Sequence, residues 1–159
     1  MTKFLLRVLA LGLFTTASLA AQTTTWTAIA STGAVDEASL GSYAVTGPTL
    51  SHNAASLTDV VARYNITDVS GTEQPGWTTL EMSASNATGG MVRADLYQLD
   101  PCGGDPIHLC IIFAQGNSCR TCTFGAGTFD FANNLYFVEV KISRGATNQT
   151  PSATAFRLY

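Results

Sequence analysis

Apolar and polar side chains alternate regularly along the chain, most clearly between Tyr136 and Ser143. One face of this segment would carry Tyr136, Val138, Val140 and Ile142, and the other Glu139, Lys141 and Ser143. A two-residue period is typical of an antiparallel strand with one buried and one solvated face. The segment 62–67 alternates in the same way, which predicts that Ala62, Tyr64 and Ile66 point inward.

Glycine, proline, asparagine and aspartate divide the chain into ten strand-like segments, typical of an all-β domain. The predicted strands are 26–30, 42–46, 49–52, 58–67, 77–83, 91–99, 108–113, 128–131, 136–143 and 154–158. The best helical candidate, 35–40, is too short to form more than a turn or two. We therefore predict an all-β fold, a two-sheet antiparallel β-sandwich. Periodicity does not choose between an immunoglobulin-like and a jelly-roll strand order.

The first twenty residues have the pattern of a cleaved secretory signal peptide. Lys3 and Arg7 give this segment a positively charged start. The apolar stretch 5–14 is too short to span a membrane, and Ser18 and Ala20 provide the small residues of a cleavage site. We expect a signal peptide over 1–20, a polar lead-in over 21–25 and a single β-sandwich domain over 26–159. Such a protein would be secreted or periplasmic.

Charge and hydropathy narrow the range of partners. The net charge of the whole chain is −3, and removal of Lys3 and Arg7 would make it more negative by two. Lys141 would be the one remaining lysine, which argues against a nucleic-acid partner. The sequence has no second long apolar run, so we predict no transmembrane segment.

Four cysteines, Cys102, Cys110, Cys119 and Cys122, predict two disulfides in an exported chain. If 91–99 and 108–113 form a hairpin, Cys102 and Cys110 lie at the same end of it, which favours the local pairs Cys102–Cys110 and Cys119–Cys122. A competing chain path turns at Gly116 and Asn117 and brings Cys122 beside Cys110. A redox dithiol and a zinc site are less favoured, because no helix follows the Cys-x-x-Cys motif and only one cysteine pair is closely spaced.

No constellation of residues identifies a reaction, and no cofactor or metal is predicted. His52 and His108 are expected at strand ends, outside any recognisable nucleophile motif. The loop 100–107 is the first choice for a ligand contact, with Asp100, Asp105 and His108 as its binding residues, because binding residues favour loops on rigid scaffolds. Its acids and glycines are more typical of a turn than of a calcium site.

The sequence therefore favours an exported non-catalytic protein, a binding or surface module whose partner is an extracellular ligand or envelope component, with carbohydrate as the best specific candidate. A small extracellular hydrolase with a loop-built site is the alternative, and a small outer-membrane barrel is a further one. Five aromatic residues could stack on sugar rings if they lined one exposed face, although such residues more commonly fill a core: Trp26, Trp77, Tyr43, Tyr64 and Tyr97. Asn65, Asn86 and Asn148 match the glycosylation acceptor pattern and would matter only in a host that modifies it.

Overall fold

The computed structural model describes residues 24–85, 89–114 and 116–159. The expected signal peptide, most of the lead-in and Asn86 lie outside these residues. The described residues form two short 3₁₀ helices, η1 (Ala30–Thr32) and η2 (Glu37–Ser39), and eleven strands. The strands are β1 (Trp26–Ile29), β2 (Ala34–Val35), β3 (Tyr43–Thr46), β4 (Thr49–His52), β5 (Val60–Ile66), β6 (Thr79–Ser85), β7 (Met91–Leu99), β8 (Ile107–Ala114), β9 (Ser118–Thr123), β10 (Leu135–Ser143) and β11 (Ser152–Leu158).

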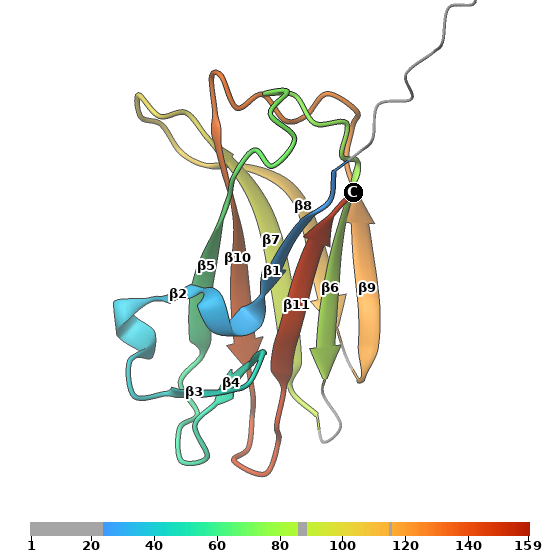
Figure 1. The fold of residues 1–159 in the computed structure, drawn as a ribbon. Helices are drawn as coiled ribbons and strands as arrows, with labels where there is room; N and C mark the ends of the chain where they lie inside the picture. Colours follow the sequence, from blue (N-terminus) through green and yellow to red (C-terminus); the bar gives the residue numbers. More distant parts are fainter. Residues whose placement is uncertain (1–23, 86–88, 115) are drawn as a thin grey trace, which may run out of the picture.

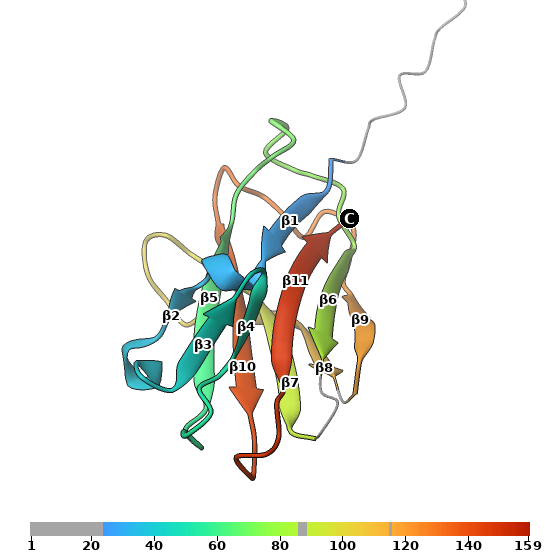
Figure 2. The same cartoon turned by 60° about the horizontal axis from the view of Figure 1, so that its bottom comes forward.

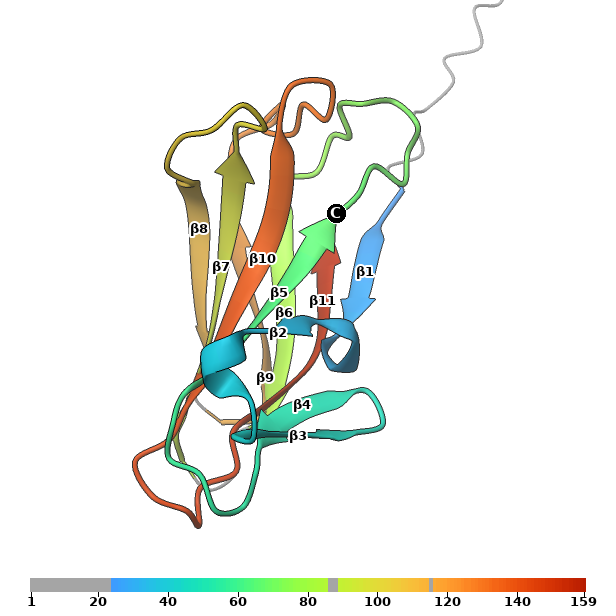
Figure 3. The same cartoon turned by 90° about the vertical axis from the view of Figure 1, so that its left-hand side faces the viewer.

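The strands form two antiparallel sheets packed face to face, so the predicted β-sandwich is confirmed (Figure 1). The first sheet has the order β3-β4-β11-β6-β9, with β1 also paired to β11. The second has the order β2-β5-β10-β7-β8, and Figure 3 shows β8, β7, β10 and β5 next to one another. Most neighbours within a sheet are distant in sequence, which periodicity could not reveal. Among the described helices, none is long and apolar enough to cross a membrane.

The core lies between the inner faces of the two sheets. β10 is a central strand between β5 and β7, and its predicted inner face is confirmed. Tyr136 is 2% exposed and Val138, Val140 and Ile142 are fully buried, so this row contributes hydrophobic stabilisation along the whole strand. The predicted inward residues of β5, Ala62, Tyr64 and Ile66, are buried as well.

The predicted strand over 128–131 is wrong. This segment belongs to the loop between β9 and β10, and its fully buried Phe129 contacts Trp77 edge-on at 5.1 Å. The Tyr136 hydroxyl donates to the Thr128 carbonyl at 2.9 Å and accepts from the Asp130 amide at 2.8 Å. The alternation of Phe129 and Phe131 therefore reflects an aromatic plug at one end of the sandwich, because loop residues can bury alternate side chains without pairing.

Two strands of the structure, β9 and β2, are not among the predicted strands. β9 has side chains that are mostly polar and exposed, so it shows no apolar period, and it is recognised only by its pairing with β6. β2 has two residues, which is too short for any periodic signal. The helical candidate 35–40 contains only the single 3₁₀ turn of η2, where Asp36 caps the helix by accepting from the Ala38 amide at 3.0 Å.

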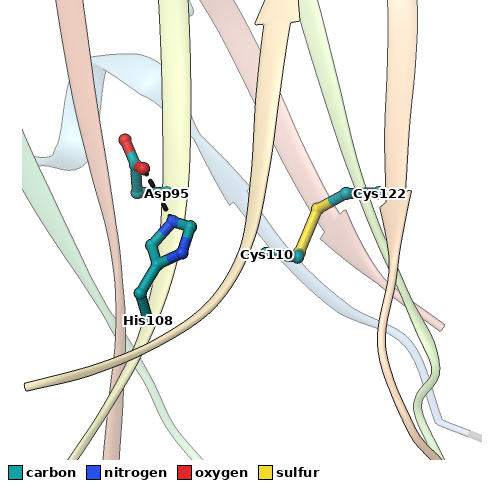
Figure 4. The surroundings of a disulfide bond; sticks show 4 residues. All are labelled: Asp95, His108, Cys110 and Cys122. Atoms are coloured by element: carbon teal, nitrogen blue, oxygen red, sulfur yellow. Dashed lines mark hydrogen bonds and ion pairs between the residues drawn. A yellow bond between two sulfur atoms is a disulfide. The ribbon is translucent and has the colours of Figure 1, made fainter.

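The favoured cysteine pairing is wrong, and the competing one is present: Cys110 is bonded to Cys122, with 6.0 Å between their Cα atoms. Cys110 lies on β8 and Cys122 on β9, so the bond links the edges of the two sheets (Figure 4). Cys119 cannot reach Cys122 because residues three apart on an extended strand face opposite sides. Cys102 lies in the loop before β8, whereas the Cys110 side chain points inward further along the strand. Within the described residues Cys102 and Cys119 are exposed and unbonded, which corrects the expectation of two disulfides.

The β4–β5 and β10–β11 loops lie at the end of the sandwich opposite the aromatic plug (Figure 2), and a buried arginine joins them. Arg144 is 8% exposed, and its guanidinium donates to carbonyls on both the β4–β5 and the β10–β11 loops. Its partners include the Asn53 carbonyl at 2.6 Å and the Gln149 carbonyl at 3.0 Å. Because a buried charge must be saturated with hydrogen bonds, this residue has a structural role.

Candidate functional site

The expected binding residues of the β7–β8 loop do not form one cluster. Asp100 lies just after β7, where its Oδ1 accepts from the Cys102 amide at 2.8 Å and supports the turn. Asp105 is exposed in the same loop. His108 belongs to β8, and its Nε2 bonds to Asp95 of β7 at 2.8 Å rather than to either loop carboxylate.

A register shift in the β7–β8 hairpin decides which way His108 points. Leu96 pairs with Cys110 and Tyr97 pairs with His108, so Leu109 is an extra residue on β8. A regular strand would place His108 on the inward face that it shares by two-residue spacing with Cys110. The bulge moves His108 to the outer face of the sheet, and Figure 4 shows it on the opposite side of β8 from the disulfide.

Asp95 is the centre of a charged network on this outer face. Although its side chain points away from the core, it is only 2% exposed because neighbouring side chains cover it. Arg93 donates through Nε to Oδ2 at 2.6 Å and through Nη2 to Oδ1 at 2.7 Å, which is a bidentate pair. The hydrogen bond to Asp95 raises the pKa of Arg93. Because the carboxylate accepts from His108 too, both its oxygens are occupied and it fixes the imidazole in orientation.

Three rings form a row across β8, β7 and β10 on the same face. The ring centroids of Tyr97 and His108 are 5.3 Å apart, edge to face, and those of Tyr97 and Phe137 are 5.1 Å apart, stacked. Tyr97 and Phe137 are partly exposed, and the His108 side chain is 42% exposed. Burial, followed by the negative charge of Asp95, raises the pKa of Tyr97, so its hydroxyl is neutral and can donate.

Charged side chains surround the row in pairs. Arg63 of β5 donates to Glu139 at 2.8 Å and to Asp36 at 3.0 Å. Lys141 lies 2.7 Å from the Asp59 carboxylate. A backbone hydrogen bond from Ala38, and then the bond from Arg63, lower the pKa of Asp36. The face is therefore polar but locally neutralised.

Two hollows lie beside β5, at the end of the ring row. One, of about 280 Å³, is lined by Ala28, Thr32, Ala34, Arg63, Tyr64 and Asn65. The other, of about 250 Å³, is lined by Asn65, Ile66, Thr67, Leu135 and Tyr136. Asn65 belongs to both, and it is also the cross-strand partner of Phe137. The ring row and the hollows thus form one continuous surface, which we call the ring face: His108, Tyr97, Phe137 and Asn65.

Other candidates from the sequence do not assemble a site. His52 is 7% exposed, its Nε2 donates to the Ile142 carbonyl at 3.0 Å, and burial lowers its pKa. Trp26 and Trp77 are core residues at 5% and 0% exposure, so neither can stack on a ligand. Within the described ranges, no group of three or more His, Cys, Asp or Glu side chains could hold a metal ion.

Sequence reasoning singled out His108 and Tyr97 but missed Asp95 and Phe137. A signal for Phe137 was present, because it is an aromatic residue on the face of β10 that also carries Glu139 and Lys141. Asp95 likewise interrupts an apolar stretch of β7. Their convergence depended on strand order and on the bulge, neither of which is visible in the periodicity.

No protein-family model matches the chain, and no curated protein matches it in sequence. Among solved structures, it is similar to the CBM36-1 domain of a multidomain xylanase from the hindgut metagenome of Trinervitermes trinervoides, with a TM-score of 0.52 and 9% identity over 86% of this chain and 97% of that chain. A family 11 carbohydrate-binding module from Clostridium thermocellum, in complex with a β-1,3-1,4-mixed-linked tetrasaccharide, matches with a TM-score of 0.42 and 10% identity over 85% and 86% of the two chains. The first of these similarities shows that the chain shares the β-sandwich fold of that domain.

Proposed function

We propose that this protein is an exported, non-catalytic carbohydrate-binding module that holds its ligand on the ring face. The observation that carries the proposal is the row of partly exposed rings on three neighbouring strands, in which Asp95 fixes His108 and the rings pack on one another. Sugar rings have apolar faces that pack on aromatic rings, and hydroxyl edges that bond to polar side chains. Rings that are already ordered lose little conformational entropy on binding.

Two further findings support this proposal. The same fold occurs in the CBM36-1 domain of a multidomain xylanase. The Cys110–Cys122 disulfide fits a protein of an oxidising compartment, as the N-terminal pattern also suggests. The exposed loop residues Asp100 and Asp105 lie between β7 and β8, the strands that carry Tyr97 and His108, and in this proposal they would add polar contacts to the ligand.

The test is binding to a panel of soluble polysaccharides, measured by affinity electrophoresis and titration calorimetry. We expect Y97A/F137A to weaken binding about tenfold or more, because it removes the apolar platform. Y159A is the matched control, since Tyr159 is an exposed aromatic residue, 40% accessible, that lies beside Arg157 and away from the ring face. Unchanged binding by Y97A/F137A would refute the proposed site.

A small hydrolase is the second candidate, favoured by the Asp95–His108 pair. A carboxylate that orients an imidazole is the base unit of many hydrolases, although a nucleophile or an activated water would still be required. Turnover of a glycan or ester that disappears in D100A/D105A/H108A, while the fold persists, would favour this candidate. We expect no turnover in the wild-type protein.

A further inference from the structure

The main chain of β5 is open where it passes Asn65. The Val61 carbonyl accepts from the Asp36 amide at 2.9 Å, and the Val61 amide donates to Ser39 Oγ at 2.9 Å, so Val61 directs both groups toward β2. Because this direction alternates along a strand, Asn65 directs its own amide and carbonyl to the same side. β2 begins at Ala34, which pairs with Arg63, so no residue of β2 lies opposite Asn65. The Asn65 main chain therefore faces the larger hollow instead of a neighbouring strand.

Gly33 directly precedes β2 and crosses over the Tyr64 ring. A Cβ atom at Gly33 would lie 2.5 Å from Tyr64 Cζ, so the chain can pass over the Tyr64 ring only without a side chain. The Tyr64 hydroxyl donates to the Ala30 carbonyl at 2.6 Å, which fixes the ring under this crossing. The larger hollow is thus a built feature of the fold, with a rigid aromatic floor.

The Asn65 side chain is available to a ligand. It is exposed, and among the described residues its amide makes no hydrogen bond to protein. An amide offers a donor and an acceptor side by side, which matches two neighbouring hydroxyl groups of a sugar. Arg63, in the same hollow, is already committed to Glu139 and Asp36, so it is not free to neutralise an acidic ligand.

The same self-pairing holds for the other cations described on this face. Arg93 is paired with Asp95, and Lys141 with Asp59. A uronic acid would have to break one of these pairs or remain unpaired beside their carboxylates, and either outcome costs free energy. An uncharged sugar needs no such exchange.

Resting on the proposed function, we infer that the Asn65 hollow is the end subsite of the ring face and selects an uncharged glycan. One sugar unit of the glycan stacks on Phe137, and the next unit lies in this hollow. There, one of its hydroxyl groups donates to Asn65 Oδ1 and another accepts from Asn65 Nδ2. Asn65 is then a specificity-determining residue. The rings of the ring face contribute affinity by stacking, whichever sugar is bound.

Titration calorimetry with short and long oligosaccharides of one neutral sugar tests the subsite, alongside polygalacturonate as an acidic probe. We expect N65A to bind the long oligosaccharide about five- to tenfold more weakly, which corresponds to two neutral hydrogen bonds. In the wild type the long ligand should bind more tightly than the short one, and this gain should disappear in N65A. If Asn65 had only a structural role, N65A would weaken both ligands alike and the gain would remain. N65D, which keeps the shape and removes the donor, should lose at least as much. N148A is the matched control, because Asn148 is an exposed asparagine in the β10–β11 loop.

The outcomes separate this inference from the proposed function. If Y97A/F137A abolishes binding while N65A matches the wild type, the end subsite is refuted and the ring face remains. If polygalacturonate binds more tightly than the neutral ligands, the selectivity for uncharged glycan is refuted. If Y97A/F137A binds normally, or the wild type binds none of the probes, the proposed function fails and this inference fails with it.

Discussion

The two faces of the β5-β10-β7-β8 sheet are built from the same strands and handle water in opposite ways. On β10, Val138 and Val140 are fully buried, whereas Glu139 between them pairs with the exposed Arg63. The inner face is stabilised by excluding water and has no tolerance for an unpaired charge. The outer face carries charged side chains. In the described pairs, attraction to the opposite charge offsets part of the entropy that these side chains lose on being ordered. This difference teaches that the inner face carries the fold, while the outer face is free to carry a ligand.

The largest effect is expected from V140D, which places a carboxylate on the inner face. Burying an unpaired charge in the middle of β10 should cost several kcal/mol, enough to unfold a domain of ordinary stability. Urea denaturation followed by circular dichroism measures this loss. A stable, folded V140D protein would break the comparison, because the inner face would then accept charge.

Removing the disulfide with C110A/C122A should have the next largest effect. The bond closes a loop of 12 residues and joins the two sheets, so its loss should lower the free energy of unfolding by about 3 kcal/mol. The control is C102A/C119A, which removes the exposed thiols and should leave the denaturation midpoint unchanged. Equal effects of the two double variants would contradict the observed pairing.

D95A removes the buried carboxylate of the outer face and measures how much stability it contributes. It leaves Arg93 and His108 without their carboxylate, but both side chains are more than a third exposed and can be hydrated. The loss should therefore be about 1–3 kcal/mol, smaller than for V140D. Denaturation gives the stability, and a loss of glycan affinity larger than in H108A would show that Asp95 orders more than one ring-face residue.

His52 makes the stability of the inner side dependent on pH. Burial lowers its pKa in the folded protein, so the unfolded chain binds a proton more readily. The stability is therefore complete above the unfolded pKa of about 6.5 and falls as the pH decreases toward the folded value, with a slope of at most about 1.4 kcal/mol per pH unit. Denaturation midpoints between pH 7 and pH 5 should show this fall in the wild type and less of it in H52Q. A pH dependence identical in both proteins would exclude His52 as its source.

E139A should have the smallest effect. Its partner Arg63 is 46% exposed and keeps Asp36, so the loss should be well under about 1 kcal/mol. Thermal unfolding is sensitive enough to detect this difference. If E139A were as damaging as V140D, the two faces would not differ in the way proposed here.

Sequence by itself determined the strands with a clear period and the direction in which their side chains point. Tyr136 to Ile142 and Ala62 to Ile66 are examples, because burial on one face of a strand imposes a two-residue pattern whatever the neighbours are. Turn residues likewise located the hairpin of β7 and β8 and the loop that carries Asp100 and Asp105. These features are local, so they leave a local trace.

Only the tertiary structure decided the features that join distant segments. The pairing of Cys110 with Cys122, the aromatic plug and the alignment of Asn65, Phe137, Tyr97 and His108 all depend on strand order. The outward position of His108 further depends on one extra residue in β8. Such features arise from non-local contacts, in which many strand orders satisfy the same alternating pattern and only the best-packed arrangement of the whole chain selects one.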